Sequence, residues 1–193
     1  MGTYRAVIGG MATLALCVGA DSAYAGHHRI SADALGHFQR GVQAYVTLHR
    51  QEERLLPPLD IPSEPGKIQQ WSDALALTIA AGRQAAREGD IIDAAAASVF
   101  RACIRTTLGD RGRATVLASG GGWNGEEMAP AVNGRVHWRG GSYMPASLIA
   151  ALPPLPPELQ YRFIGPDLAL IDIGAGLVVD VLRDALPPVS TAL

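Results

Sequence analysis

Two adjacent histidines, His27 and His28, stand where a new N-terminus is expected to form. They follow an apolar run at 6–20 and the tripeptide Ala-Tyr-Ala at 23–25, a pattern typical of a secretory signal peptide that is cleaved after the tripeptide. Cleavage there makes Gly26 the first residue, so its free amine, two backbone amides and the His28 ring could bind Cu(II) or Ni(II) in a square plane. We therefore predict a metal site at Gly26, His27 and His28. The alternative is a polar tail that binds no metal.

A second candidate site is the glycine-rich segment 120–127, GGGWNGEE. Backbone N–H groups of such a loop can approach a phosphate, but no Lys-Ser/Thr pair follows and no strand-to-helix context is evident. Trp123, Glu126 and Glu127 could line a carbohydrate or peptide site, and paired carboxylates are the groups that a glycoside hydrolase uses. The pattern favours a flexible loop, and a hydrolase that uses this loop is an alternative hypothesis.

Four further places in the chain carry reactive side chains without the partners that chemistry requires. His49 and Glu53 are four residues apart on a predicted helix, so they share a face. A metal site usually needs three or more protein ligands, and the pattern therefore favours a solvated, charged face. Cys103 lies among apolar side chains and is expected to be a buried small hydrophobe. His137 stands in a predicted strand, and Ser142 lies outside a Gly-x-Ser-x-Gly elbow, so we predict no catalytic residue.

The N-terminal half of the chain shows helical periodicity. Apolar residues recur at steps of three and four over 31–54, 65–87 and 91–108, which predicts three helices. Prolines separate the first two, and Gly89 followed by Asp90 can end one helix and cap the next. We expect the second and third helices to form an antiparallel hairpin with the first packed along it. The side chains expected between the helices are Phe38, Trp71, Val99 and Phe100.

The C-terminal part is the densest run of strand-forming residues, 161–182. Turn residues interrupt it at 165–167 and 174–176, so we predict three short antiparallel strands at 160–164, 168–173 and 177–182. Residues 177–186 also fit a helical period, and their β-branched content favours the strand. The residues expected on the inner face of the sheet are Tyr161, Phe163 and Leu170.

These patterns divide the chain into four segments. They are a signal peptide at 1–25, a helical region at 26–108, a glycine-rich loop at 109–131 and a small β-rich region at 132–193. The last segment should also hold a short strand within 132–144 and a short helix at 145–151. The predicted fold class is therefore α+β, an N-terminal bundle of about three helices followed by a small antiparallel sheet.

Residues 152–172, LPPLPPELQYRFIGPDLALID, followed by LVVDVL at 177–182, resemble the C-terminal end of a group of small exported bacterial proteins of unknown function. They are also similar, more distantly, to the hairpin of periplasmic proteins linked to nickel and cobalt homeostasis. In that broader set the pattern Tyr-Arg-x-x-Gly-x-Asp-Leu-x-Leu-x-Asp is mostly a structural signature. The resemblance implies export and a C-terminal hairpin, and it brings no catalytic residue. Gly174 and Gly176 stand where the exported group more often has longer side chains, which predicts a looser turn.

Composition limits the partners of this 193-residue chain. Its formal net charge is −2, so there is no basic field to attract nucleic acid or anionic lipid. The apolar run near the N-terminus is too short to favour a permanent membrane span, and the predicted cleavage would remove it. We therefore expect no stable membrane span after cleavage. We therefore predict a periplasmic or secreted, non-enzymatic interaction or structural module with a protein partner in the cell envelope. Its one cofactor alternative is Cu or Ni at residues 26–28.

Overall fold

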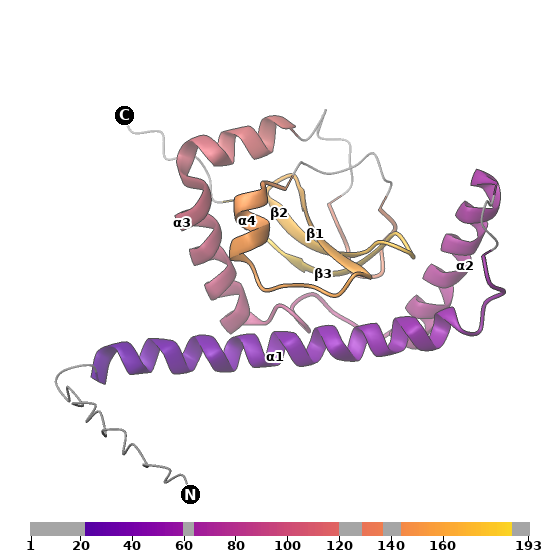
Figure 1. Cartoon of the computed structure of the whole chain (residues 1–193), viewed down its shortest axis with the longest axis horizontal. Helices are drawn as coiled ribbons and strands as arrows, with labels where there is room; N and C mark the ends of the chain where they lie inside the picture. The colour runs from indigo at the N-terminus through magenta and orange to yellow at the C-terminus, as the bar shows by residue number, and fades with distance from the viewer. Residues whose placement is uncertain (1–21, 60–63, 120–128, 137–143, 187–193) are drawn as a thin grey trace, which may run out of the picture.

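The computed structural model describes residues 22–59, 64–119, 129–136 and 144–186, with side chains in the first helix described from Leu35 onward. Within these ranges three long helices precede a three-stranded antiparallel sheet (Figure 1). This confirms the predicted α+β fold class.

The long helices are α1 (Ser22–Glu53), α2 (Pro65–Gly82) and α3 (Ala94–Ser119), and the short α4 spans Ala146–Ala151. Both α2 and α3 pack against α1, but at different parts of its length, and the sheet lies between them (Figure 1). The predicted α2–α3 hairpin is therefore wrong. The reason is that α2 already ends at Gly82, and the loop that follows is anchored to the sheet instead of turning back directly.

The bounds of α3 differ from the prediction at both ends. The helix begins at Ala94, because Asp93 accepts a hydrogen bond from the Ala96 amide at 2.8 Å and so caps its N-terminus. At the other end, Gly109 adopts φ 55° and ψ −172°, a non-helical conformation that makes a kink between two helical segments of α3. The second segment runs to Ser119, within the part of the chain predicted to be loop. Its residues are mostly compatible with a helix, and Val116 is buried there.

Helix α1 also starts earlier than expected, at Ser22 instead of residue 31. The backbone of residues 26–30 is therefore helical. No proline stands in residues 22–30, and one glycine, Gly26, is tolerated inside a helix, so nothing in the sequence forces a boundary at residue 31.

The sheet consists of β1 (Leu159–Ile164), β2 (Asp167–Asp172) and β3 (Leu177–Leu182) in the order β1-β2-β3. These bounds confirm the three predicted strands and decide against a helix starting at Leu177. Positive φ angles at Gly165 (57°) and Gly176 (58°) accompany the two reversals. The strand expected within 132–144 is reduced to one bridge, Arg135 to Leu177, and residues 137–143 lie outside the described ranges.

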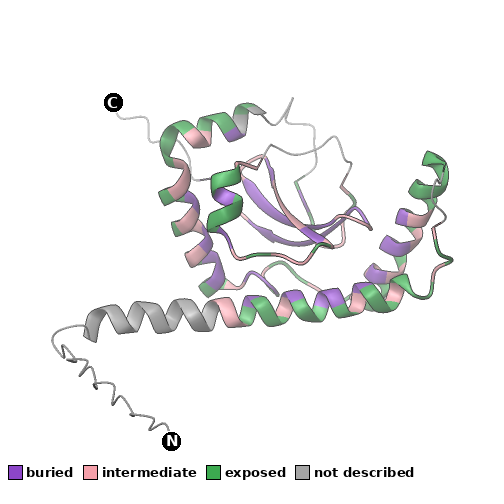
Figure 2. Ribbon diagram, in the orientation of Figure 1, coloured by how far each residue is buried: buried purple, intermediate pink, exposed green. Residues whose placement is uncertain are grey.

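The main core fills the space between the helices and one face of the sheet (Figure 2). Phe38, Phe100, Phe163 and Leu170 are buried as predicted, and the Phe38 and Phe100 rings meet edge-to-face with centroids 5.1 Å apart. Tyr161 packs against this core from the inner face of the sheet, as predicted, and is partly buried; Trp71 and Val99, which were expected to be buried, are also only partly so. Two of these keep a polar atom for the backbone, since the Trp71 indole N–H donates to the Pro57 carbonyl at 3.1 Å and the Tyr161 hydroxyl to the Pro153 carbonyl at 3.0 Å.

The opposite face of the sheet carries a second, smaller apolar cluster. Alternation along each strand sends successive side chains to opposite faces. Leu168 and Leu170 therefore enter the main core, whereas Ala169 and Ile171 belong to the second cluster. Because Asp172 is two residues after Leu170, the same alternation points its carboxylate toward the helices.

A buried polar site between helix α1 and the sheet

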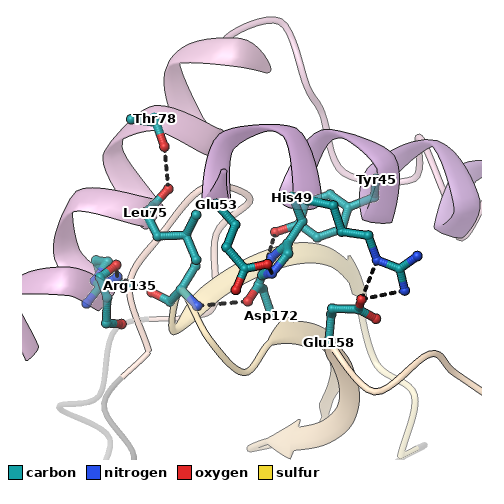
Figure 3. Close-up of polar contacts among 11 residues, drawn as sticks. Tyr45, His49, Glu53, Leu75, Thr78, Arg135, Glu158 and Asp172 are labelled. Carbon is teal, nitrogen blue, oxygen red and sulfur yellow. Dashed lines mark hydrogen bonds and ion pairs between the residues drawn. The ribbon is translucent and has the colours of Figure 1, made fainter. Parts of the chain in front are cut away.

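Asp172, at the end of β2, is fully buried and is the centre of a polar site (Figure 3). Its Oδ2 accepts a hydrogen bond from the Tyr45 hydroxyl at 2.7 Å and lies 2.5 Å from Nδ1 of His49. Its Oδ1 accepts the backbone N–H of Ala175 at 2.8 Å. A buried carboxylate is stable only when such donors replace water, and here they come from α1 and from the β2–β3 turn.

Tyr45 and His49 reach the same carboxylate because they are one turn apart on α1 and share a face. His49 is only 3% exposed. The prediction of a solvated charged face is therefore wrong for His49, and holds only for its neighbour Glu53, which is exposed. The partner that draws His49 inward lies 123 residues away in the sequence, so no local pattern could indicate it.

The electrostatics of the site favour a charged His49. Burial lowers the pKa of His49, but the hydrogen bond and negative charge of Asp172, together with the charges of Glu53 and Glu158, outweigh this and hold the pKa above 6.5. Glu53 Oε2 lies 3.9 Å from Nε2, the other ring nitrogen. Burial, followed by the charge of Asp172, raises the pKa of Tyr45, so this residue stays a neutral hydroxyl donor.

Glu158 and Arg50 form the outer wall of the site. The Arg50 Nη2 and Glu158 Oε1 atoms are 2.6 Å apart. Burial raises the pKa of Glu158, but hydrogen bonds from its own backbone and from Arg50 lower this pKa by more. The net effect is a pKa below the ordinary value for a glutamate. Glu158 therefore stays ionised and adds to the negative field around His49.

Two other carboxylates of the sheet also bind neighbouring segments. Asp180, inside β3, is fully buried and accepts the N–H groups of Gly89, Ile91 and Ile92 at 2.7–2.8 Å. Asp167 accepts from the Arg183 guanidinium at 2.7 Å. None of these three aspartates was predicted to be an anchor. The available signal was a lone aspartate within or beside an apolar strand, as in LALID and LVVDVL, because a charge is seldom buried without partners.

The Asp172 site is connected to α2 through Arg135. Ala175 donates its backbone N–H to Asp172, and its carbonyl, in the next peptide group, accepts from the Arg135 guanidinium. The same guanidinium donates to the Ser72 carbonyl at 3.2 Å and pairs with Asp73, and both of these residues lie on α2. Beside it is a hollow of about 270 Å³, whose lining residues are Asp73, Ala76, Leu77, Ala80, Asn133, Arg135 and Leu177. We call this the α2 hollow.

The remaining predicted site residues fall in three places. The predicted metal site, Gly26, His27 and His28, falls within helix α1, where only the backbone of these residues is described. The metal site therefore stays a prediction. The segment 120–127 with Trp123, Glu126 and Glu127 is also outside the described residues, as are His137 and Ser142. Cys103 is partly rather than fully buried, and its thiol contacts the Ala151 carbonyl at 3.3 Å. Among the described side chains, no three potential ligands gather closely enough to hold a metal ion.

Comparisons of the chain with known protein families, characterised proteins and solved structures found no match. In the described ranges, no helix has both the length and the apolar character to cross a bilayer. A functional proposal must therefore rest on the geometry of this chain.

Proposed function

We propose that this protein is an exported, non-enzymatic interaction module of the cell envelope, and that its partner binds at α2. The observation that carries the proposal is a large apolar side chain of this helix, Leu77, which is 72% exposed and lines the α2 hollow. Ile68 is 46% exposed, but it lies nine residues earlier, on the opposite side of the helix, and does not line the hollow. An exposed apolar side chain beside a hollow with a polar rim is a feature that protein-binding sites share.

The α2 hollow gives this surface a definite shape. Leu77, Ala80 and Leu177 supply its apolar wall, while Asp73 and Arg135 form an ion pair at the rim. The pairing leaves the rim without a free charge to attract a strongly charged partner. The expected partner is therefore a segment of an envelope protein that inserts one apolar side chain into the hollow and has little net charge.

The buried polar groups support a structural role for the rest of the domain. Asp172 and Asp180 join α1 and the 83–93 loop to the sheet, and His49 is closed into the same framework. Among the described residues, Asp172, Asp180 and His49 are buried groups that could serve as a general acid or base. Each of them instead makes hydrogen bonds or ion pairs within the fold. Such anchoring suits a rigid support that holds α2 in a fixed position.

The experiment is a binding test with matched surface variants. The mature chain, Leu77→Asp and Ile149→Asp are each immobilised and exposed to envelope extract, and retained proteins are identified by mass spectrometry. Ile149 is 57% exposed on α4, so the control makes the same change at a similarly exposed site. We expect one protein to be retained by wild type and by Ile149→Asp but lost with Leu77→Asp, with melting temperatures unchanged. Equal retention by all three chains would contradict a partner site at α2.

A further inference from the structure

Two sets of polar contacts meet at the backbone of Ala175, between His49 and the α2 hollow; Figure 3 shows His49, Asp172 and Arg135. His49 contacts Asp172 on one carboxylate oxygen, and the other oxygen binds the Ala175 N–H. The Ala175 carbonyl accepts from Arg135, which holds Ser72 and Asp73 of α2. The N–H and the carbonyl belong to consecutive peptide groups, so the backbone of one residue is held from both sides. We call this arrangement the His49–Arg135 relay.

The groups around His49 decide what its proton does. Asp172 faces it from β2, Glu53 from its own helix, and Glu158 from the segment before β1, where Arg50 pairs with Glu158. A Cβ built on Gly174 of the turn would meet both the His49 ring and the apolar Leu75 of α2, so these two side chains lie beside the same glycine. The charges of three carboxylates therefore act on one imidazole, and its proton provides the charge that balances the buried Asp172.

We propose that proton binding at His49 regulates the α2 hollow through the His49–Arg135 relay. With the proton present, a charge-assisted hydrogen bond fixes Asp172, which holds the N–H side of Ala175 and so limits the position of the next peptide group, whose carbonyl binds the Arg135 guanidinium. When the proton leaves, Asp172 keeps only neutral donors, and a buried carboxylate without an opposite charge is destabilised. The turn then loosens its hold on Arg135, which forms the rim of the hollow.

The direction of the effect follows from the contacts. The 2.5 Å contact between Nδ1 and Oδ2 is as short as a charge-assisted hydrogen bond, so we assign the observed arrangement to protonated His49. It persists while the pH is below the pKa of this ring, which lies above 6.5. Alkaline conditions release it. Since the regulation of partner binding rests on the proposed function, we expect the partner to dissociate more readily as the pH rises through that value.

The relay can be tested in the free protein, without any partner. Nuclear magnetic resonance would follow the His49 ring, the Ala175 amide, the Arg135 side-chain N–H and the Leu77 methyl groups between pH 5 and pH 9. We expect all four signals to change with one common midpoint above pH 6.5, a range in which Glu158, whose pKa is lowered, stays ionised. His49→Gln should remove the change at Ala175, Arg135 and Leu77.

His37→Gln is the matched control, because His37 lies on the same helix but is exposed and contacts Asp90 and Asp93 instead. It should leave the common midpoint unchanged. The proposal is overturned if the His49 ring titrates while Ala175, Arg135 and Leu77 do not. The wild-type titration alone decides this, so the test survives if His49→Gln fails to fold. Its result is independent of the Leu77→Asp binding test, which addresses the partner site itself.

Discussion

Nδ1 of His49 and Oδ2 of Asp172 lie 2.5 Å apart and join the last turns of α1 to the end of β2. The two residues are separated by 123 positions in the chain. This contact places a titratable group inside the fold, in a carboxylate field that favours its charged form. It therefore links the stability of the fold to pH.

We expect His49→Gln to destabilise the protein mainly at acidic and neutral pH. The folded state holds the His49 proton more tightly than the unfolded state, so protonation stabilises the fold. This contribution is complete below about pH 6.5, the ordinary pKa of histidine, and is lost as the pH rises through the raised pKa. Breaking a buried ion pair costs at most about 3–5 kcal/mol. Urea unfolding of both chains from pH 5 to pH 9 measures the difference, and a constant difference would contradict the prediction.

Asp180→Ala should be among the most damaging single changes in the sheet. It removes the acceptor for the N–H groups of Gly89, Ile91 and Ile92, and those of the two isoleucines are buried. Each buried N–H left without a partner costs about 1–3 kcal/mol, so we expect a loss of roughly 3 kcal/mol or more. Hydrogen exchange should accelerate first at Ile91 and Ile92. Asp110→Ala, at an exposed position, is the control and should change the free energy of unfolding by less than about 0.5 kcal/mol.

The two glycines of the β2–β3 turn should respond differently to alanine. Gly176 has φ 58°, and a side chain in this left-handed region costs about 1–2 kcal/mol. Gly174 has no such φ, and a Cβ there would meet the His49 ring at 3.4 Å, an ordinary contact distance. Gly174→Ala should therefore be neutral or stabilise by up to about 1 kcal/mol, because it restricts the unfolded chain. Thermal unfolding of the two variants tests this, and equal losses would show that the turn is strained at both positions.

The N-terminal metal site is tested by titrating Cu(II) and Ni(II) into protein exported through its own signal, with the intact mass read on the same sample. A start at Gly26 should give tight one-to-one binding, which His28→Ala should abolish without changing the melting temperature. The physical reason is that the third residue supplies the ring nitrogen of the square plane. A chain that starts at Gly26 and binds neither metal would reject the site.

Local signals were sufficient for the sheet but not for the arrangement of the helices. The three strands could be predicted because apolar runs and turn residues alternate within a few positions, as at Gly165 and Gly176. The helical segment of α3 that follows Gly109 could not be predicted. A glycine with positive φ can either end a helix or form a kink between two helical segments, and the sequence does not show which occurs. The site at Asp172 depended on contacts with α1 that have no trace in the neighbouring residues.

The long sequence separations of these anchors also order the assembly of the chain. The N–H groups of Ile91 and Ile92 are made early in synthesis, but their acceptor at Asp180 arrives almost ninety residues later. The same holds for Tyr45 and His49, whose common partner is near the C-terminus. Contacts between distant segments must first overcome the entropy of closing the loop between them. The polar groups of α1 and of residues 91 and 92 therefore lack their carboxylate partners until the last strands are synthesised. A chain that stops short of β3 should be largely unfolded rather than a smaller stable domain.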